Sequence, residues 1–241
     1  MGPDRRPALL LSCEHASRAL PRTWRPWFRG WEEALAGHRG ADAGARRLAR
    51  ELAESFGAPL LEGRWSRLLV DLNRPAEHPG CVGRPLRRLP PAAQRELLES
   101  YWTPWHAVLR AELARLLELP GGVLHLSVHS FTPVWKGRPR AVDVGVLDDP
   151  ARAAERRLSG QFLGELRRRL PGWRIRRNLP YRGWTAGTVS TLRREFPGDG
   201  YRGIELEVSQ AVVAGGGWRR CRAAVSEALA AVCQGDRRPA R

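Results

Sequence analysis

Largely apolar segments alternate with amphipathic segments along most of the chain. Residues 7–13 form one apolar run, and residues 123–128 form another directly after two glycines. Runs of this length are typical of strands that are buried on both faces of a sheet. Over residues 44–56, apolar side chains recur at three- and four-residue spacing, which predicts a helix that Gly57 ends. The alternation of the two patterns predicts an α/β fold.

The remaining segments follow the same alternation. We predict further strands over residues 67–72, 141–147, 173–177 and 203–208, and helices over residues 92–119, 151–170 and 218–233. Pro104 interrupts the first of these helices, so a bend is expected there. The tail from Gly235 onward carries no such pattern and is expected to be frayed.

Strands that alternate with helices predict a three-layer α/β/α arrangement, in which helices cover both faces of a mixed, largely parallel sheet. With 241 residues, the chain fits a single catalytic domain. In sheets of this kind the functional side chains collect at the carboxyl ends of the strands. The ends of the predicted strands are therefore where a site is expected.

The formal net charge of +16 raises the question of a nucleic-acid partner. Nearly all of the basic residues are arginines, however, and they are spread along the chain rather than gathered in one basic arm. No nucleic-acid-binding motif accompanies them, and a codon bias toward G and C explains such a composition. The charge favours a positive field that attracts a small anionic substrate over a polyanion partner.

The apolar segments also bear on location. None approaches the length of a membrane span, and the run before Cys13 is too short for a signal peptide. The cysteines are scattered and form no C-x-x-C pair: Cys13, Cys81, Cys221 and Cys233. This spacing indicates reduced, mostly buried thiols rather than a zinc knuckle or a redox dithiol. The sequence thus predicts a cytoplasmic protein without membrane contact.

Polar side chains mark the ends of four predicted strands. They are Glu14-His15, Asp71 to Arg74, His129-Ser130, and Glu205 with Glu207. Either histidine alone is compatible with a place in the core or at a rim, but two histidines at one sheet edge favour metal ligation. A catalytic zinc site typically takes neutral imidazoles and one carboxylate, and it keeps one position for water.

A series of longer motifs contains these residues. In chain order they are Ser-Cys-Glu-His-Ala-Ser at 12–17, His38-x-x-x-Asp42-x-Gly-Ala, Ser66 to Arg74, Val128-His-Ser-Phe-Thr-Pro133, Asn178-x-Pro-Tyr181-x-Gly183, and Gly203-Ile-Glu-Leu-Glu207-Val. Together they resemble the N-formylglutamate amidohydrolases and their unassigned relatives, over about residues 8–212. The resemblance implies a zinc-carboxypeptidase-like fold and metal-assisted amide hydrolysis. Glu-His-Ala-Ser stands where the namesake branch has Pro-His-Ser-Gly, so the acyl group and the amino-acid part of the substrate stay open.

The resemblance places zinc on His15 and His129. Zinc carboxypeptidases have a glutamate three residues after the first histidine, but Arg18 stands there. Asp42 and Glu14 are the candidates for the third ligand, and Asp42 is preferred. The side chain of Glu14 would leave an extended backbone on the face opposite to His15, so Glu14 is expected to support a zinc-bound imidazole instead. The alternative role of Asp42 is to cap a helix.

Glu207 is the expected general base, because a carboxylate near zinc can take a proton from the bound water. Glu205 lies two residues away on the same strand face, and the pair is also compatible with a solvated sheet edge. Asn73 and Arg74 resemble the pair that binds the substrate carboxylate in this enzyme group. A planar guanidinium matches a carboxylate, and a neighbouring amide completes the contact.

Further candidates for contacts to a carboxylate or an oxyanion are Arg138 and Tyr181, with Arg67 and Arg140, while His38 is expected at the rim. The predicted function is a zinc-dependent amidohydrolase whose partner is a small carboxylate-bearing molecule, such as an N-acyl amino acid. The alternative is a basic binding module of the same fold that engages a polyanion without catalysis. A serine hydrolase is disfavoured, because the chain has no G-x-S-x-G motif. The oligomeric state is not predicted.

Overall fold

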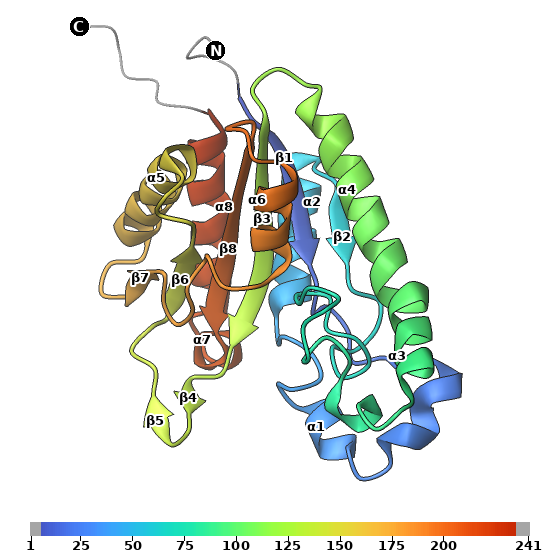
Figure 1. Cartoon of the computed structure of the whole chain (residues 1–241). Helices are drawn as coiled ribbons and strands as arrows, with labels where there is room; N and C mark the ends of the chain where they lie inside the picture. Colours follow the sequence, from blue (N-terminus) through green and yellow to red (C-terminus); the bar gives the residue numbers. More distant parts are fainter. Residues whose placement is uncertain (1–5, 235–241) are drawn as a thin grey trace, which may run out of the picture.

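A computed structural model describes residues 6–234, and its centre is a six-stranded sheet (Figure 1). The strands lie side by side in the order β2-β1-β3-β8-β6-β7. Their bounds are β1 Ala8–Cys13, β2 Leu60–Glu62, β3 Val123–Phe131, β6 Val144–Leu147, β7 Ile175–Arg177 and β8 Tyr201–Ser209. Strand direction changes once across the sheet: the first four strands in this order are parallel, β6 pairs antiparallel with β8, and β7 is parallel to β6.

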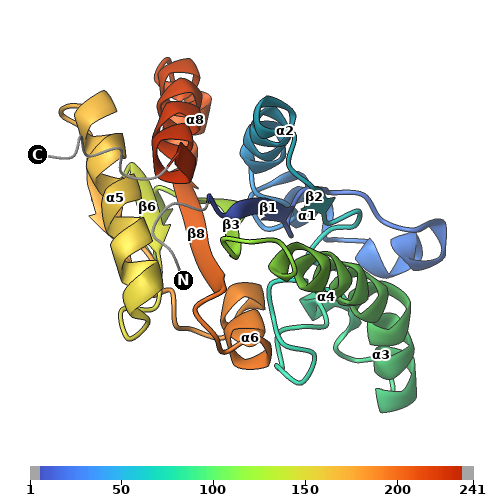
Figure 2. The ribbon, with the colours of Figure 1, turned by 90° about the horizontal axis from the view of Figure 1, so that it is seen from above.

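Helices cover both faces of this sheet, as the view from above shows (Figure 2). One face carries α2 (Ala45–Phe56), α5 (Ala153–Arg169) and α8 (Trp218–Gln234). The other face carries α4 (Thr103–Leu117) and α6 (Thr188–Glu195). The prediction of an α/β fold with a mixed, largely parallel sheet between two helical layers is confirmed.

The two faces of the sheet differ in chemistry, because successive side chains of a strand point to opposite faces. Toward α2, α5 and α8 the strands present apolar side chains that form one extended core. On the other face, pairing sets polar residues next to one another: Ser12 beside Ser127, Ser127 beside Glu205, and His129 beside Glu207. All five are buried. Buried polar groups are destabilising without partners. We therefore expect the polar side chains on this face to form hydrogen bonds or to contact a bound ligand.

One predicted strand is wrong. Residues 67–72 form turns, with a single bridge between Val70 and Val82 in place of a sheet pairing. The apolar run is nonetheless buried, in a second core that it shares with two short 3-10 helices, η1 (Arg22–Phe28) and η2 (Arg84–Leu86). The run therefore reports burial, and burial alone does not distinguish a strand from a packed loop. Conversely, the structure contains strand β2, which the sequence pattern does not predict.

The predicted helix over residues 92–119 is divided. It consists of α3 (Pro91–Leu97), a π-helical turn η3 (Leu98–Trp102), and α4. The irregular turn lies directly before Pro104, which has no N–H to donate to the preceding turn. The expected interruption at this proline is present, as a change of helix type.

The short elements lie around the end of the sheet where β3 and β8 finish. They are α1 (Glu32–Ala36), the hairpin of β4 (Val134–Trp135) and β5 (Arg138–Pro139), and α7 (Gln210–Ala214). All four cysteines are free thiols, and all but Cys233 are buried. No helix in the described residues is both long enough and apolar enough to cross a membrane. The tail from Gly235, predicted to fray, lies outside the described residues.

Candidate active site

A cavity of about 1020 Å³ opens at the carboxyl ends of β1, β3 and β8. Strand ends contribute part of its lining, and the loops that follow them contribute the rest. His38 also lines the cavity and is exposed, as expected for a rim residue. The lining contains most of the site residues that the sequence predicts: His15, Asp42, Asn73, Arg74, His129, Tyr181 and Glu207.

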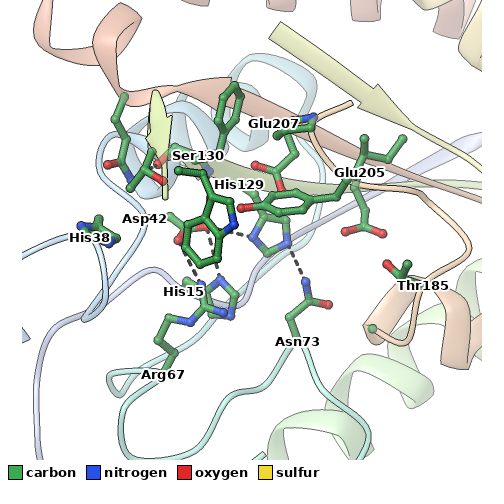
Figure 3. A pocket seen from close by; sticks show the side chains of 18 of the residues that line it. His15, His38, Asp42, Arg67, Asn73, His129, Ser130, Thr185, Glu205 and Glu207 are labelled. Carbon is green, nitrogen blue, oxygen red and sulfur yellow. Dashed lines mark hydrogen bonds and ion pairs between the residues drawn. The ribbon is translucent and has the colours of Figure 1, made fainter. Parts of the chain in front are cut away.

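Two imidazoles and one carboxylate converge in this cavity (Figure 3). Asp42 presents its Oδ2 atom to both rings, 3.3 Å from Nδ1 of His15 and 2.9 Å from Nδ1 of His129. None of the three residues is more than 7% exposed. One ligand atom from each lies within 4.8 Å of the others. The three residues therefore form a group that could hold a metal ion.

The carboxylate of Asp42 faces the histidines and not the helix that follows it. Helix α2 has Gly44 at its N-cap position, and no side chain caps it. The backbone N–H of Asp42 donates to the carbonyl oxygen of His15 at 3.0 Å, which ties the two segments together. The geometry therefore favours the ligand role of Asp42 over the capping role.

The outer nitrogen of each imidazole is held by a further carboxylate. Nε2 of His15 lies 2.7 Å from Oδ1 of Asp71, and Nε2 of His129 lies 3.2 Å from Oε2 of Glu14. A carboxylate behind a histidine fixes the tautomer that leaves the other nitrogen free for a metal. Glu14 thus lies where a supporting residue is expected. Sequence reasoning leaves Asp71 without a role, although its place two residues before Asn73 is a signal that points to it.

A buried chain of hydrogen bonds continues behind Glu14. The hydroxyls of Ser12 and Ser127 each donate to one of its carboxylate oxygens, both at 2.8 Å. Ser12 also lies 2.8 Å from Nε2 of His125, and Nδ1 of that ring lies 2.9 Å from the hydroxyl of Tyr201. All of these side chains are buried. Glu14 is thereby fixed in position without contact to solvent.

The charges in this cluster shift several pKa values. Burial raises the pKa of Asp42, but the two imidazoles outweigh burial and hold it well below its ordinary value. Burial also raises the pKa of Glu14, yet its contacts with His129 bring the pKa down to about 2. Desolvation lowers the pKa of His129, but hydrogen bonds to Asp42 and Glu14 raise it well above its ordinary value. The carboxylates are therefore ionised at neutral pH, and the cluster attracts positive charge.

Glu207 faces the same space from the neighbouring strand. Its pairing partner across β3 and β8 is His129, and its Oε2 atom is buried without a hydrogen-bond partner among the described residues. Burial raises the pKa of Glu207 to about 8; His129 opposes this rise, and Asp42 and Glu205 add to it. A buried carboxyl group with a pKa near neutrality and an unpartnered oxygen is a candidate proton carrier.

Asn73 and Arg74 reach the cavity from the loop after residue 70. The Asn73 Oδ1 atom accepts a hydrogen bond of 2.8 Å from the backbone N–H of Thr188, and its Nδ2 atom lies 3.4 Å from Nε2 of His129. Arg74 donates to the carbonyl oxygen of Ala186 at 3.3 Å. No carboxylate of the described chain pairs with this guanidinium, so its charge is available to a ligand.

The other substrate-binding candidates lie in different places. Arg67 pairs with Asp71 at 2.8 Å and so contributes to the carboxylate cluster. Arg140 and Tyr181 both line the cavity, and Arg140 donates to the Tyr181 hydroxyl at 3.0 Å. Arg138, in the exposed strand β5, is not among the residues that line the cavity.

Known proteins resemble this chain over most of its length. The sequence model of the family described as N-formylglutamate amidohydrolase matches residues 7–214. The chain belongs to this N-formylglutamate amidohydrolase family. The resemblance that the motifs carry over residues 8–212 is thus confirmed. The enzyme class predicted from the sequence, a hydrolase of carbon–nitrogen bonds other than peptide bonds, is the class of this family.

Individual relatives are similar to different extents. The N-formylglutamate deformylase of Pseudomonas aeruginosa is 33% identical over 130 residues, with 43% of this chain and 49% of that protein covered, so the match spans about half of that relative. The solved gene product Atu2144 of Agrobacterium tumefaciens is 28% identical with a TM-score of 0.78, and 94% of this chain and 92% of that chain are covered. The solved N-formylglutamate amidohydrolase of Ralstonia eutropha JMP134 shares the fold at 20% identity, with a TM-score of 0.67 and coverage of 96% and 92%.

In this member of the amidohydrolase family, the donor set suits a divalent metal ion. Two imidazole nitrogens and one carboxylate oxygen could hold such an ion, and this combination of donors is typical of catalytic zinc sites. The surroundings agree with the donors, because Glu14 and Asp71 hold the outer nitrogens of both rings. The ionised carboxylates of the cluster add charge that a cation offsets.

Proposed function

We propose that this chain is a zinc-dependent amidohydrolase that cleaves the N-acyl amide of a small carboxylate-bearing substrate, such as an N-acyl amino acid. The observation that supports it most directly is the convergence of His15, Asp42 and His129 beside the unpartnered carboxyl oxygen of Glu207. The relatives support the same reaction, since the Pseudomonas aeruginosa protein is named an N-formylglutamate deformylase.

His15, Asp42 and His129 would hold the zinc ion in this proposal. When bound, zinc would supply Lewis-acid chemistry toward the carbonyl and would lower the pKa of the attacking water to about 7. Glu14 and Asp71 keep the two imidazoles oriented through their outer nitrogens. The role of these two carboxylates is positioning, because neither reaches the reacting atoms in this arrangement.

Glu207 takes a proton from the attacking water and delivers it to the leaving nitrogen. One carbon–oxygen bond forms and the amide carbon–nitrogen bond breaks, so the products are a carboxylic acid and an amine. Arg74, with the amide of Asn73, binds the substrate carboxylate and thereby fixes the position of the scissile bond. The open fork of Arg74 suits this task, since no carboxylate of the described chain occupies it.

Metal analysis and a hydrolysis assay test this proposal together. Purified protein is expected to contain about one zinc ion per chain and to release formate from N-formyl-L-glutamate or an acyl acid from a related N-acyl amino acid. His129→Ala is expected to lose the metal and the activity together. Stoichiometric zinc in both His15→Ala and His129→Ala would contradict the site.

The substrate carboxylate can be tested separately with acid and amide forms of one substrate. Arg74→Ala is expected chiefly to raise KM for the acid and to narrow the gap in kcat/KM between the acid and its uncharged amide analogue. Arg138→Ala is the matched control, because Arg138 is an arginine outside the cavity lining. If Arg138→Ala narrows the gap and Arg74→Ala does not, the carboxylate is held elsewhere.

A basic binding module of the same fold is the rival function. It predicts nucleic-acid binding that weakens steeply with salt, in a protein without zinc. The buried and unpartnered Glu207 carboxyl favours catalysis over this rival, because an anion-binding surface has no use for it.

A further inference from the structure

The cavity is larger than a formylated amino acid requires. Its volume is about 1020 Å³. Pockets of about 300–1,000 Å³ bury most of the surface of a drug-sized ligand, which is larger than a formyl group joined to one amino acid. With the carboxylate at Arg74 and the amide beside His129, a formyl group would leave a large part of this cavity unfilled.

The unfilled part has an aromatic and apolar wall. Trp135, Leu179 and Tyr181 line the cavity, and these residues are 55%, 47% and 42% exposed. Trp135 lies in the β4–β5 hairpin, whereas Leu179 and Tyr181 follow β7, so segments distant in the sequence build one surface. Large exposed apolar side chains that gather on a concave surface indicate a binding function, whereas scattered ones do not.

Arg140 connects the aromatic side chains of this wall. Its guanidinium lies 5.6 Å from the ring centre of Phe131, 5.3 Å from that of Trp135 and 4.9 Å from that of Tyr181. It also donates to the Tyr181 hydroxyl at 3.0 Å and to the carbonyl oxygen of Thr132 at 3.4 Å. Cation–π contacts and hydrogen bonds together fix the orientation of the rings before any ligand binds.

The loop that carries Leu179 is also firmly seated. A Cβ atom added at Gly145, in β6, would lie 2.0 Å from the carbonyl oxygen of Leu179, so the loop packs directly on the strand. Gly145 pairs with Glu207 across β6 and β8. The Leu179 end of the apolar wall therefore lies beside the proposed general base, on the β6 side of the reaction centre. Arg74 approaches from the other side, where its partner Ala186 precedes α6.

We propose that the surface formed by Trp135, Arg140, Leu179 and Tyr181 binds a bulky, planar apolar acyl group. This inference rests on the proposed function. The preferred substrates are then N-aroyl amino acids, in which an aromatic ring replaces the formyl hydrogen. Hydrolysis adds one water, breaks the carbon–nitrogen bond, and yields an aromatic carboxylic acid and the free amino acid. The aromatic ring stacks on the guanidinium-supported rings of the wall, while Arg74 holds the carboxylate.

Two substrates that differ only in the acyl group test this proposal, N-formyl-L-glutamate and N-benzoyl-L-glutamate. The parent protein, loaded with zinc, is expected to show a kcat/KM for the benzoyl compound at least about tenfold above that for the formyl compound. In Trp135→Ala this ratio is expected to fall by about tenfold or more, since one face of the stacking site is lost. Benzoate is expected to inhibit the parent protein competitively, and Trp135→Ala more weakly.

Trp184→Ala is the matched control. Trp184 is 45% exposed and lies three residues beyond Tyr181, but it is not among the residues that line the cavity. Its variant is expected to keep the parent ratio. A parent protein that prefers the formyl compound, or a Trp135→Ala ratio equal to that of the parent, overturns the subsite and leaves the proposed function intact. If neither compound nor any other N-acyl amino acid is hydrolysed, the proposed function fails, and the subsite proposal fails with it.

Discussion

A single oxygen of Asp42 contacts both imidazoles of the site, at 3.3 Å and 2.9 Å. The same atom accepts a hydrogen bond of 3.3 Å from the backbone N–H of Ser130. Three segments of the chain therefore meet at one carboxylate, from the turn after β1, the start of α2 and the end of β3. Loss of its charge should therefore weaken metal binding at the proposed site more than it destabilises α2, since this side chain does not cap the helix.

The first prediction compares Asp42→Asn with Glu14→Gln. If Asp42 is a ligand and Glu14 a supporting residue, Glu14→Gln should weaken zinc binding by about 10–100-fold and Asp42→Asn by more. Competition with a chelator measures both affinities, and thermal unfolding of the metal-free variants controls for damage to the fold. Should Glu14→Gln release zinc while Asp42→Asn retains it, the two roles are exchanged.

The second prediction concerns Glu207, whose proposed task is to move a proton. Glu207→Gln keeps the shape of the side chain but cannot accept a proton, so kcat should fall by about a hundredfold or more. Zinc content and KM should stay near the parent values, because the residue acts only as the reaction proceeds. Steady-state kinetics with metal analysis tests this, and Glu205→Gln is the comparison variant. Near-normal turnover in Glu207→Gln would move the base elsewhere, with Glu205 tested next.

Some residues of the site can be predicted from the sequence and others cannot, for physical reasons. His15, His129 and Glu207 lie at or near the ends of apolar strands, and such positions are visible in a one-dimensional pattern. Asp71 contacts His15, which lies 56 residues away in the sequence. Ser127 lies within the buried run of β3 and contacts Glu14 on a different segment. Contacts of that kind depend on register, which the apolar pattern alone does not specify.

At the scale of elements, the loop that carries Asn73 and Arg74 depends on the helical segment opposite. The indole of Trp102 donates to the carbonyl oxygen of Arg74 at 2.9 Å, and Nε2 of His106 donates to the carbonyl oxygen of Leu72 at 3.0 Å. The two rings stack with centres 3.9 Å apart. The predicted strand over residues 67–72 failed here because this loop satisfies its backbone by side chains and turns rather than by a neighbouring strand.

The third prediction follows from His106 at this junction. Burial lowers its pKa from an ordinary value of 6.5 to about 4, although the hydrogen bond to the carbonyl oxygen of Leu72 opposes this shift. A lowered pKa in the folded state means that the unfolded chain binds more protons between these two values. Stability is therefore complete above pH 6.5 and falls as the pH drops toward 4, by about 3 kcal/mol from this residue.

Denaturant unfolding of the metal-free protein at several pH values measures that loss. His106→Gln should be less stable than the parent at pH 7, and the free energy of unfolding should depend less on pH between 6.5 and 4. Burial also lowers the pKa of His125 to about 4. Because His125 remains in the variant, part of the dependence of stability on pH remains as well. An unchanged slope in His106→Gln would show that the pKa of this ring is not lowered in the folded chain.

At the scale of the whole molecule, the order of strands and helices could be predicted because each has its own apolar pattern. The reversal of β6 and β7 could not, because strand direction depends on how the connecting segments cross the sheet. That reversal matters for the site. It turns the amino end of β6 toward the carboxyl end of β8, so Val142 lines the same cavity as Glu207.

Charge is the other property of the whole molecule that bears on function. The chain carries a formal net charge of +16, and the cavity is lined by Arg39, Arg67, Arg74, Arg87 and Arg140. Arg67 pairs with carboxylates of the site, but none of the other four pairs with a carboxylate within residues 6–234. A concave surface lined by unpaired cations raises the local concentration of an anionic substrate.

The last prediction is that this field speeds substrate capture and is screened by salt. The kcat/KM for an N-acyl amino acid should fall by roughly threefold to tenfold as the ionic strength rises from about 0.02 M to 0.5 M, because the screening length shrinks to a few ångströms. The uncharged amide analogue should show little change, since it carries no charge for the field to act on. Stopped-flow or steady-state assays with both substrates, in the zinc-loaded protein, separate capture from damage to the enzyme. An equal decline for acid and amide would mean that salt acts on the protein itself and that the arginines do not steer the substrate.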